Sequence, residues 1–327
     1  MKNALRPPVA STSLVIALLA FFLQAAPSPA WGESGAQADA RGFPSVLPRA
    51  APRCVHGPGS GPSLDDPAHL TAIALQGGKG RDRIVNTDAL IADANATPQA
   101  GSDHARATAI GILAGNGSDL VVNSGTIDVS ATATLTGAGE ADSVAIGIDA
   151  GNGKDGVVNG GIDPAEGGTE GEALPPDIVV NATTTVTVSD TTWDLIGAES
   201  EAGIDASATA VGISGGNGKD GIVNEGTMAV TATTEVSVTN VAVTLVDAEH
   251  PDATIVGRAV AIGLDGGNGK DGIVNSGDFS VSAESTVSTT SIAFTGIAVP
   301  WPIDASLDGS TLATASATGI RSGNEIG

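Results

Sequence analysis

Five aspartates recur in the chain, each within a glycine-rich phrase of nearly constant composition. The phrase reads GGKGRDRIV at 77–85, AGNGSDLVV at 114–122, AGNGKDGVV at 150–158, and GGNGKDGIV at both 215–223 and 266–274. Carboxylates attract cations, and glycine permits the tight turns that can gather backbone carbonyls around a bound ion. The aspartates are Asp82, Asp119, Asp155, Asp220 and Asp271.

Catalytic patterns are missing from the sequence. The four histidines are scattered, and no G-x-S-x-G, HExxH or phosphate-binding G-x-x-x-x-G-K-[ST] motif occurs. The sequence therefore favours a protein that is not an enzyme. The alternative is a carbohydrate-active enzyme, a polysaccharide lyase or hydrolase, which would need two carboxylates about 5–10 Å apart in a groove. Candidate carboxylates are Glu199, Glu201 and Asp205.

The amino-acid composition limits which classes of partner the chain can bind and which kind of core it can form. The formal net charge is −23, so nucleic acid and anionic membranes would be repelled. The single cysteine, Cys54, excludes an intrachain disulfide and makes a cysteine-based zinc site implausible. With 45 glycines, 2% aromatic residues and no tyrosine, a wide globular core cannot be filled. A thin solenoid core of Ala, Val and Ile suits this composition better.

The first thirty residues have the features of a secretory signal peptide. Lys2 and Arg6 precede an apolar run, and small residues end at Ala30. The run is too short to span a bilayer, so no transmembrane segment is expected in the mature chain. Residues 31–70 are rich in Pro, Gly and Ala, and we interpret them as a linker or amino-terminal cap. Repeats occupy 71–327, and the last is interpreted as a truncated sixth unit.

The repeats predict the fold. Alternating phrases such as ATAIGI precede most of the glycine-rich phrases, and further alternating runs follow them. Successive aspartates are 37, 36, 65 and 51 residues apart, which suits one three-stranded coil of a parallel β-helix per unit, with insertions. The fold class is therefore all-β, a β-solenoid with one coil per 36–65 residues. The extra length is placed at 190–206, 247–258 and 296–312, together with 160–176.

Period-two alternation assigns the inner face of each coil. It also turns inward the asparagine that follows each phrase, so that stacked amides could form a structural ladder. These asparagines are Asn86, Asn123, Asn159, Asn224 and Asn275. The predicted inward apolar sets are Ile110, Ile112, Val121, Ile127, Val129 and Ala131 in the second unit, Val211, Ile213, Ile222, Met228, Val230 and Ala232 in the fourth, and Ile262, Leu264, Ile273, Phe279, Val281 and Ala283 in the fifth.

The glycine–aspartate phrase resembles the haemolysin-type nonapeptide G-G-x-G-x-D-x-U-x, in which U is a large apolar residue. The resemblance implies calcium, bound between stacked turns by aspartate and by backbone carbonyls. Carried over by position, the five aspartates would be the carboxylate ligands. The carbonyls would come from Gly80, Gly117, Gly153, Gly218 and Gly269. Here, however, the phrases are not in tandem, and Arg81, Lys154, Lys219 or Lys270 precedes the aspartate. A purely structural turn, with lysine of one coil pairing with aspartate of the next, is the alternative.

The whole unit resembles the passenger domains of bacterial autotransporters and related surface β-helix proteins, through phrases such as AIGI, IVNSG and GTIDVSA. This resemblance implies export to the cell surface or medium and a role in adhesion. The expected partners are a host or cell-surface protein or a carbohydrate. Trp193 and Trp301, on the predicted insertions, are aromatic side chains that could contact such a partner or fill their own loops.

Overall fold

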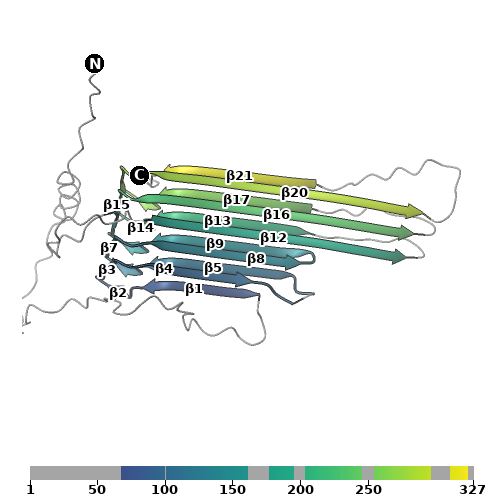
Figure 1. The fold of residues 1–327 in the computed structure, drawn as a ribbon, viewed down its shortest axis with the longest axis horizontal. Helices are drawn as coiled ribbons and strands as arrows, with labels where there is room; N and C mark the ends of the chain where they lie inside the picture. The colour runs from purple at the N-terminus through teal and green to yellow at the C-terminus, as the bar shows by residue number, and fades with distance from the viewer. Residues whose placement is uncertain are drawn as a thin grey trace, which may run out of the picture.

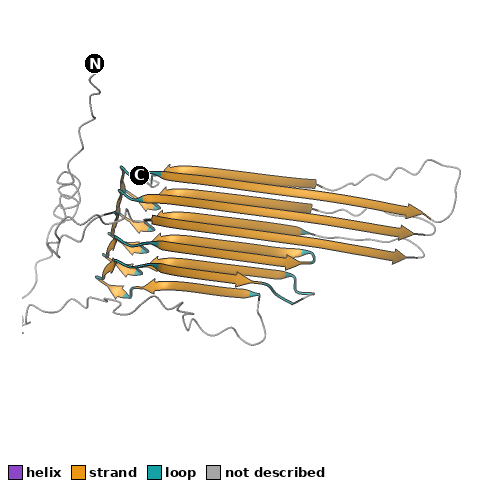
Figure 2. Cartoon of the chain, viewed as in Figure 1, coloured by secondary structure: helices purple, strands orange, loops and turns teal. Residues whose placement is uncertain are grey.

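The computed structural model describes residues 68–99, 101–160, 177–194, 203–244, 254–295 and 310–322. These residues form parallel β-strands joined by short turns, stacked as a solenoid (Figures 1 and 2). The predicted parallel β-helix is therefore confirmed. No helix in the described part of the chain has the length and apolar character needed to cross a membrane. The predicted signal peptide and most of the linker lie outside the described residues.

Each coil passes through four parallel sheets, here named A to D in chain order. Sheet A holds β1 (His69–Gln76), β5 (His104–Leu113), β9 (Gly139–Asp149), β13 (Ile204–Ser214), β17 (Thr254–Asp265) and β21 (Ser310–Arg321). Sheet B holds β2 (Lys79–Gly80), β6 (Asn116–Gly117), β10 (Asn152–Gly153), β14 (Asn217–Gly218) and β18 (Asn268–Gly269). Sheet C holds β3 (Arg83–Asn86), β7 (Leu120–Asn123), β11 (Gly156–Asn159), β15 (Gly221–Asn224) and β19 (Gly272–Asn275). Sheet D holds β4 (Leu90–Ala96), β8 (Ile127–Thr136), β12 (Asp177–Asp194), β16 (Thr227–Thr244) and β20 (Phe279–Thr295).

The register between coils places equivalent residues side by side. Ile112 pairs with Ile148, Ile148 with Ile213, and Ile213 with Leu264 along sheet A. Neighbouring strands are about 4.8 Å apart, so these side chains form a continuous column inside the solenoid. The column survives repeats of different length because the additional residues lie at the ends of the long strands and in the connections between sheets D and A, away from this column.

The core is a thin layer between the long strands of sheets A and D. Sheet A contributes mainly alanines, such as Ala105, Ala107 and Ala109, all fully or almost fully buried. Sheet D contributes larger side chains, including Ile127 and Val129, which are also buried. Small residues on one sheet let the two sheets approach closely, and this explains how a chain with so few aromatic residues closes a core.

The prediction of the inner face was wrong at Ile110, which is only half-buried. Val211 and Ile262 are buried, but they lie outside the contiguous core cluster to which Ile112, Ile213 and Leu264 belong. The cause is the glycine between each pair of residues. A side chain at Gly111 would come within 2.5 Å of Ile127 Cγ2, so this glycine faces the core next to Ile112 and the alternation shifts by one residue.

The extra length of the longer repeats is partly strand, where insertions were predicted. β8 has 10 residues, whereas β12 and β16 have 18 each, and all three belong to sheet D. Residues 190–194, 204–206, 254–258 and 310–312 are therefore strand residues. The long strands of sheet D extend beyond the ends of the sheet A strands (Figure 1). Trp193 lies near the end of β12, and His250, Trp301 and 161–176 lie outside the described residues.

Candidate functional site

The glycine–aspartate phrases form the corner that joins sheets A, B and C. Two-residue strands of sheet B occupy the middle of each corner, and every aspartate follows one of them by two residues. Glycine is required here by both conformation and space. Gly153 has φ of 153°, and a side chain at this residue would lie 1.3 Å from the carbonyl oxygen of Gly117 in the preceding coil. The coils can therefore stack in register only with glycine at this position.

The five predicted aspartates lie in a single file along the stack. The backbone N–H of Asp82 donates to Oδ1 of Asp119 at 2.8 Å, and that of Asp119 to Oδ1 of Asp155 at 2.7 Å. The next two bonds, from Asp155 to Asp220 and from Asp220 to Asp271, are both 2.9 Å. From Asp119 onward, Oδ1 of each carboxylate therefore joins its coil to the preceding coil by a hydrogen bond.

The second carboxylate oxygen of this aspartate file has no protein partner in four coils. The Oδ2 atoms of Asp119, Asp155, Asp220 and Asp271 are buried without a hydrogen-bond partner. Asp82, in the first coil, differs because its Oδ2 accepts from the backbone N–H of Gly78 at 2.7 Å. A buried oxygen without a donor is costly, so a proton or a cation would stabilise each of these positions.

Burial changes the acidity of the aspartate file. Loss of solvation raises the pKa of Asp155 to about 6 and that of Asp220 to about 7. Hydrogen bonds from the backbone oppose this rise, and the neighbouring carboxylates add to it. Desolvation also raises the pKa of Asp119. Near neutral pH, part of the file therefore holds protons unless a cation takes their place.

The lysines next to the file point away from it. Lys154 and Lys219 are exposed, whereas the adjacent Asp155 and Asp220 are buried, in the bend between the strands of sheets B and C. Among the ion pairs recorded between described residues, none contains Lys154 or Lys219. Pairing of these two lysines with the file, the alternative to calcium, is therefore not what the structure has at these coils.

The predicted calcium ligands are brought together only in part. The aspartates are aligned, but one oxygen of each is occupied by a backbone N–H. Carbonyl oxygens of Gly80, Gly117, Gly153 and Gly218 point along the stack at the glycine of the next coil, 1.3–1.5 Å from where a Cβ would be. Within the described ranges, no three His, Cys, Asp or Glu side chains are grouped as a metal site. Calcium binding at these residues stays a prediction.

The predicted asparagine ladder is confirmed. The Nδ2 of Asn86 donates to Oδ1 of Asn123 at 2.7 Å, and the same 2.7 Å bond links each later pair up to Asn275. Asn123, Asn224 and Asn275 also donate from Nδ2 to the carbonyl of the glycine two residues later. All but the last asparagine are fully buried. Their role is structural, because both ends of each buried amide are satisfied by the stack and the turn.

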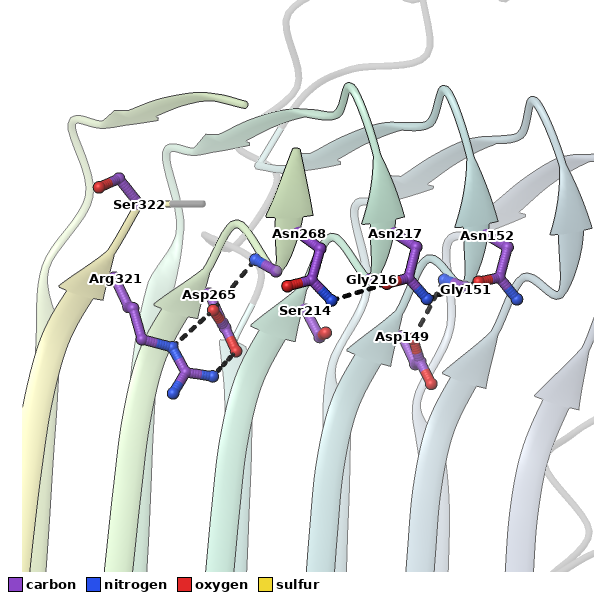
Figure 3. A pocket seen from close by; sticks show the side chains of 11 residues that line it. Asp149, Gly151, Asn152, Ser214, Gly216, Asn217, Asp265, Asn268, Arg321 and Ser322 are labelled. Carbon is purple, nitrogen blue, oxygen red and sulfur yellow. Dashed lines mark hydrogen bonds and ion pairs between the residues drawn. The ribbon is translucent and has the colours of Figure 1, made fainter. Parts of the chain in front are cut away.

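A second amide ladder lies on the outer surface of the solenoid, and it was not predicted from the sequence. Asn116, Asn152, Asn217 and Asn268, from the strands of sheet B, are exposed and joined by bonds of 2.6–2.8 Å. Asn152, Asn217 and Asn268 line a groove of about 610 Å³ along the outer corner of sheets A and B (Figure 3). The asparagine in the middle of the GNG phrase, which recurs in four of the five phrases, was the available signal for this ladder. A residue that recurs at the same place in successive coils forms a column along the stack.

Charged side chains complete this outer groove. Asp149 and Asp265, each the last residue of a sheet A strand, accept from the backbone N–H of Gly151 and Gly267 at 3.0 and 3.1 Å. Arg321 binds both carboxylate oxygens of Asp265. Burial raises the pKa of Asp149. These contacts fix the entry to the corner turn, so the aspartates have a structural role within their own coils.

A smaller groove, of about 350 Å³, contains paired carboxylates. It lies at the start of the sheet A strands, where Glu140 and Asp205 are direct neighbours in the strand register. His104 occupies the same row on β5. Arg106 lies 3.6 Å from Glu140, and Arg258 donates to Asp205 at 2.8 Å. Of the three carboxylates named as candidates, Asp205 lies here, whereas Glu199 and Glu201 lie outside the described residues.

Comparison with known proteins shows no family. No protein-family model, no curated protein and no solved structure matches the chain. The stacked parallel strands are observed directly, so the fold does not depend on a relative. The resemblances to haemolysin-type loops and to autotransporter passengers stay predictions.

Proposed function

We propose that the chain is an exported, non-catalytic scaffold at the cell surface or in the medium, with a role in adhesion. The observation that supports this proposal is the unbroken register of the stack, in which five corners stack in line while the connections from sheet D to sheet A vary in length. Only Gly137 and Ala138 join β8 to β9, whereas 245–253 join β16 to β17. Variation in the connections along one side of a stiff stack gives a binding face without disturbing the coils.

A binding experiment tests the adhesive role. Residues 31–327 would be applied to immobilised glycans and to cells, beside a variant in which 245–253 is replaced by Gly-Ala, the length of the β8–β9 connection. We expect the parent to bind and the shortened variant to bind at least about tenfold more weakly, with an unchanged far-UV spectrum. Absence of binding by the parent to both cells and glycans would contradict the proposal.

Calcium is proposed as a stabiliser of this scaffold, at the aspartate file. The support is the row of buried Oδ2 atoms without partners, which a divalent cation would satisfy and which it would keep ionised. Binding to the folded state alone raises the melting temperature in proportion to the logarithm of calcium concentration. Melting should be recorded at pH 7.5 in millimolar calcium, magnesium or chelator. Equal melting temperatures in all three would remove calcium from the proposal.

A carbohydrate-active enzyme is the second candidate, and the smaller groove is the observation that favours it. Glu140 and Asp205 are neighbouring carboxylates in the strand register and line one groove, and glycosidic-bond cleavage uses a pair of carboxylates about 5–10 Å apart. Against it, each carboxylate is already engaged by an arginine, Glu140 by Arg106 and Asp205 by Arg258. Release of reducing ends from acidic or neutral polysaccharides, abolished by Glu140→Gln, would favour this function over adhesion.

A further inference from the structure

The outward side of sheet D is a regular array of hydroxyl groups. Along each strand, alternate residues point away from the core, and in the interior strands β8, β12 and β16 most of these residues are serine or threonine. All of them are half-buried or exposed. We name them the hydroxyl face: Ser130, Thr132, Thr134, Thr136, Thr183, Thr185, Thr187, Ser189, Thr231, Thr233, Ser237 and Thr239.

The strand register arranges the hydroxyl face as a two-dimensional grid. Thr183 pairs with Thr132 on one side and with Thr233 on the other, and Thr185 pairs with Thr134 in the next row. Neighbouring strands are about 4.8 Å apart, and outward residues of one strand are about 6.6 Å apart. The strands β8, β12 and β16 run side by side in nearly the same direction (Figure 1). The unequal lengths of the repeats leave the grid intact, because the register is continuous across all three strands.

The hydroxyls of this face are available to water. Threonines that point inward from the same strands bond to the protein, since Thr184 donates to the carbonyl oxygen of Ser207 and Thr234 to that of Arg258. In contrast, no side-chain hydrogen bond between described residues involves the hydroxyl face. Each of its hydroxyls can donate one hydrogen bond and accept two. A grid of such groups can therefore hold a grid of water molecules.

Strand propensity does not by itself account for this face. Threonine is favoured at exposed positions of any strand, yet the outward side of sheet A carries the ion-paired side chains of Arg106, Asp142 and Arg258. In β8, β12 and β16, between the first and the last hydroxyl of each strand, Glu235 is the one charged outward residue. The formal net charge of the chain is −23, so this scarcity of charge is local. A regular, nearly uncharged polar surface suits a partner that is itself regular and uncharged.

We propose that the hydroxyl face binds ice. The prism face of hexagonal ice repeats in two perpendicular directions, at distances similar to the strand spacing and the two-residue spacing of the grid. Each threonine hydroxyl bonds to a water molecule of the lattice, while its methyl group fills the space between water molecules. Immobilising a water molecule from the liquid costs entropy, whereas a water molecule of the crystal is already immobilised. The face therefore binds crystalline water in preference to liquid water.

A dissolved ligand fits this face less well than a crystal does. The two grooves described above are lined by residues of sheets A and B and the segments next to them, and neither lies on sheet D. The contacts that single hydroxyls can make are weak, so stable binding requires a partner that repeats in the same two directions. The hydroxyl face is also separate from the connections between sheets D and A, on which the adhesive role rests. The two proposals are therefore independent.

Growth of ice in solutions of residues 31–327 tests the proposal. The protein should be taken up into a slowly growing ice hemisphere, and it should lower the freezing point of small ice crystals below their melting point. Thr185→Lys, in the middle of the grid, should abolish both signals, because a charged side chain displaces the lattice water around it. The matched control is Thr209→Lys, at a half-buried outward threonine of sheet A, which should keep both signals. Circular dichroism verifies the fold of both variants.

A gain of activity supplies a second readout. Glu235 pairs with Thr185 and Thr286, so Glu235→Thr completes a row of threonines and should increase uptake into ice. Exclusion of the parent from ice would overturn the proposal, as would equal uptake of Thr185→Lys and Thr209→Lys, or uptake by Glu235→Thr no greater than by the parent. Replacement of 245–253 by Gly-Ala should leave uptake into ice unchanged, so a failure of the adhesion proposal is distinguishable from a failure of this one.

Discussion

At the scale of single residues, the aspartate file sets the response of the protein to pH. The carboxylates of Asp155 and Asp220 are buried and follow one another along the stack, and burial raises the pKa of Asp155 to about 6 and of Asp220 to about 7. In the unfolded chain an aspartate titrates near 3.9. The folded state therefore binds protons that the unfolded state has released between about pH 4 and pH 7.

The first prediction follows from this difference. Stability from the aspartate file is fully present below about pH 4 and is lost as pH rises through 6 to 7, so in chelator the melting temperature should fall from pH 5 to pH 8. The change in unfolding free energy is at most several kcal/mol, at about 1.4 kcal/mol per pKa unit. Asp220→Asn keeps the Oδ1 acceptor and removes the charge, so it should flatten the profile and stabilise the chain at pH 8. Denaturant melts at both pH values provide the measurement.

Asp128→Asn is the control for this prediction, since Asp128 is exposed on sheet D. It removes one negative charge from the surface and should leave the slope of stability against pH almost unchanged. A melting temperature that rises from pH 5 to pH 8 in chelator would contradict the interpretation. The same result would show that protons do not take the place of a cation in the aspartate file.

At the scale of elements, the glycine near the end of each sheet A strand after β1 is the feature that the alternation rule did not capture. Period two holds along Ala105, Ala107 and Ala109, and then Gly111 and Ile112 both face the core. The phrase AIGI was identified as a strand, but this shift in the alternation has no signature in apolar periodicity. The repeated glycine was the signal for it, since an inward glycine that recurs in every coil after the first indicates a close approach of another segment.

The second prediction concerns this inward glycine. Alanine at Gly147 would place its Cβ 2.5 Å from the carbonyl oxygen of Gly212 and 2.8 Å from Ile178 Cγ2. Neither atom can move freely, because one belongs to the backbone and the other to a packed core, so Gly147→Ala should destabilise by about 1–3 kcal/mol or more. Gly203→Ala is the control, since no atom lies within 4 Å of its added carbon. Equal midpoints of urea unfolding for the two variants would contradict the packing argument.

The long strands of sheet D contain residues whose strand structure could not be predicted from the sequence. The runs after each asparagine were identified as strands because they alternate, and Ile127, Ile178 and Met228 do pair in one column. The residues that extend β12 to Asp194 were assigned to an insertion, because they continue beyond the length of the shortest repeat. Their strand character depends on pairing with β16, a contact between segments some fifty residues apart, and no local pattern indicates it.

At the scale of the whole molecule, stability is expected to be a sum over coils. Each interior coil bonds only to the coil before and the coil after it, through the backbone ladders, the aspartate file and the asparagine ladder. A coil can be removed without loss of the fold if its two neighbours meet in register. The aspartates and asparagines were recognisable in the sequence because this nearest-neighbour stacking demands the same residue at the same place.

The third prediction is a deletion in register. Removing 204–254 puts Ile255 where Ile204 stands, its direct partner in sheet A, and brings Asp155 next to Asp271. The shortened chain should fold, with the urea dependence of its unfolding free energy lower by roughly a fifth. Removing 209–258, one residue fewer and joined inside the strand, puts Ala259 in the place of Thr209, which reverses inside and outside beyond the junction and should prevent cooperative unfolding. Identical melts for the two deletions would contradict a stack held by register.

The two amide ladders run in opposite directions. Inside, the amide of each coil donates to the following coil, as Asn159 does to Asn224, whereas outside the amide of Asn217 donates back to Asn152. Each ladder is a line of aligned dipoles, and the two lines oppose each other at the same corner. Adding coils therefore accumulates little electric polarisation along the axis, and a solenoid of this type can change in length between relatives without acquiring a positive and a negative pole.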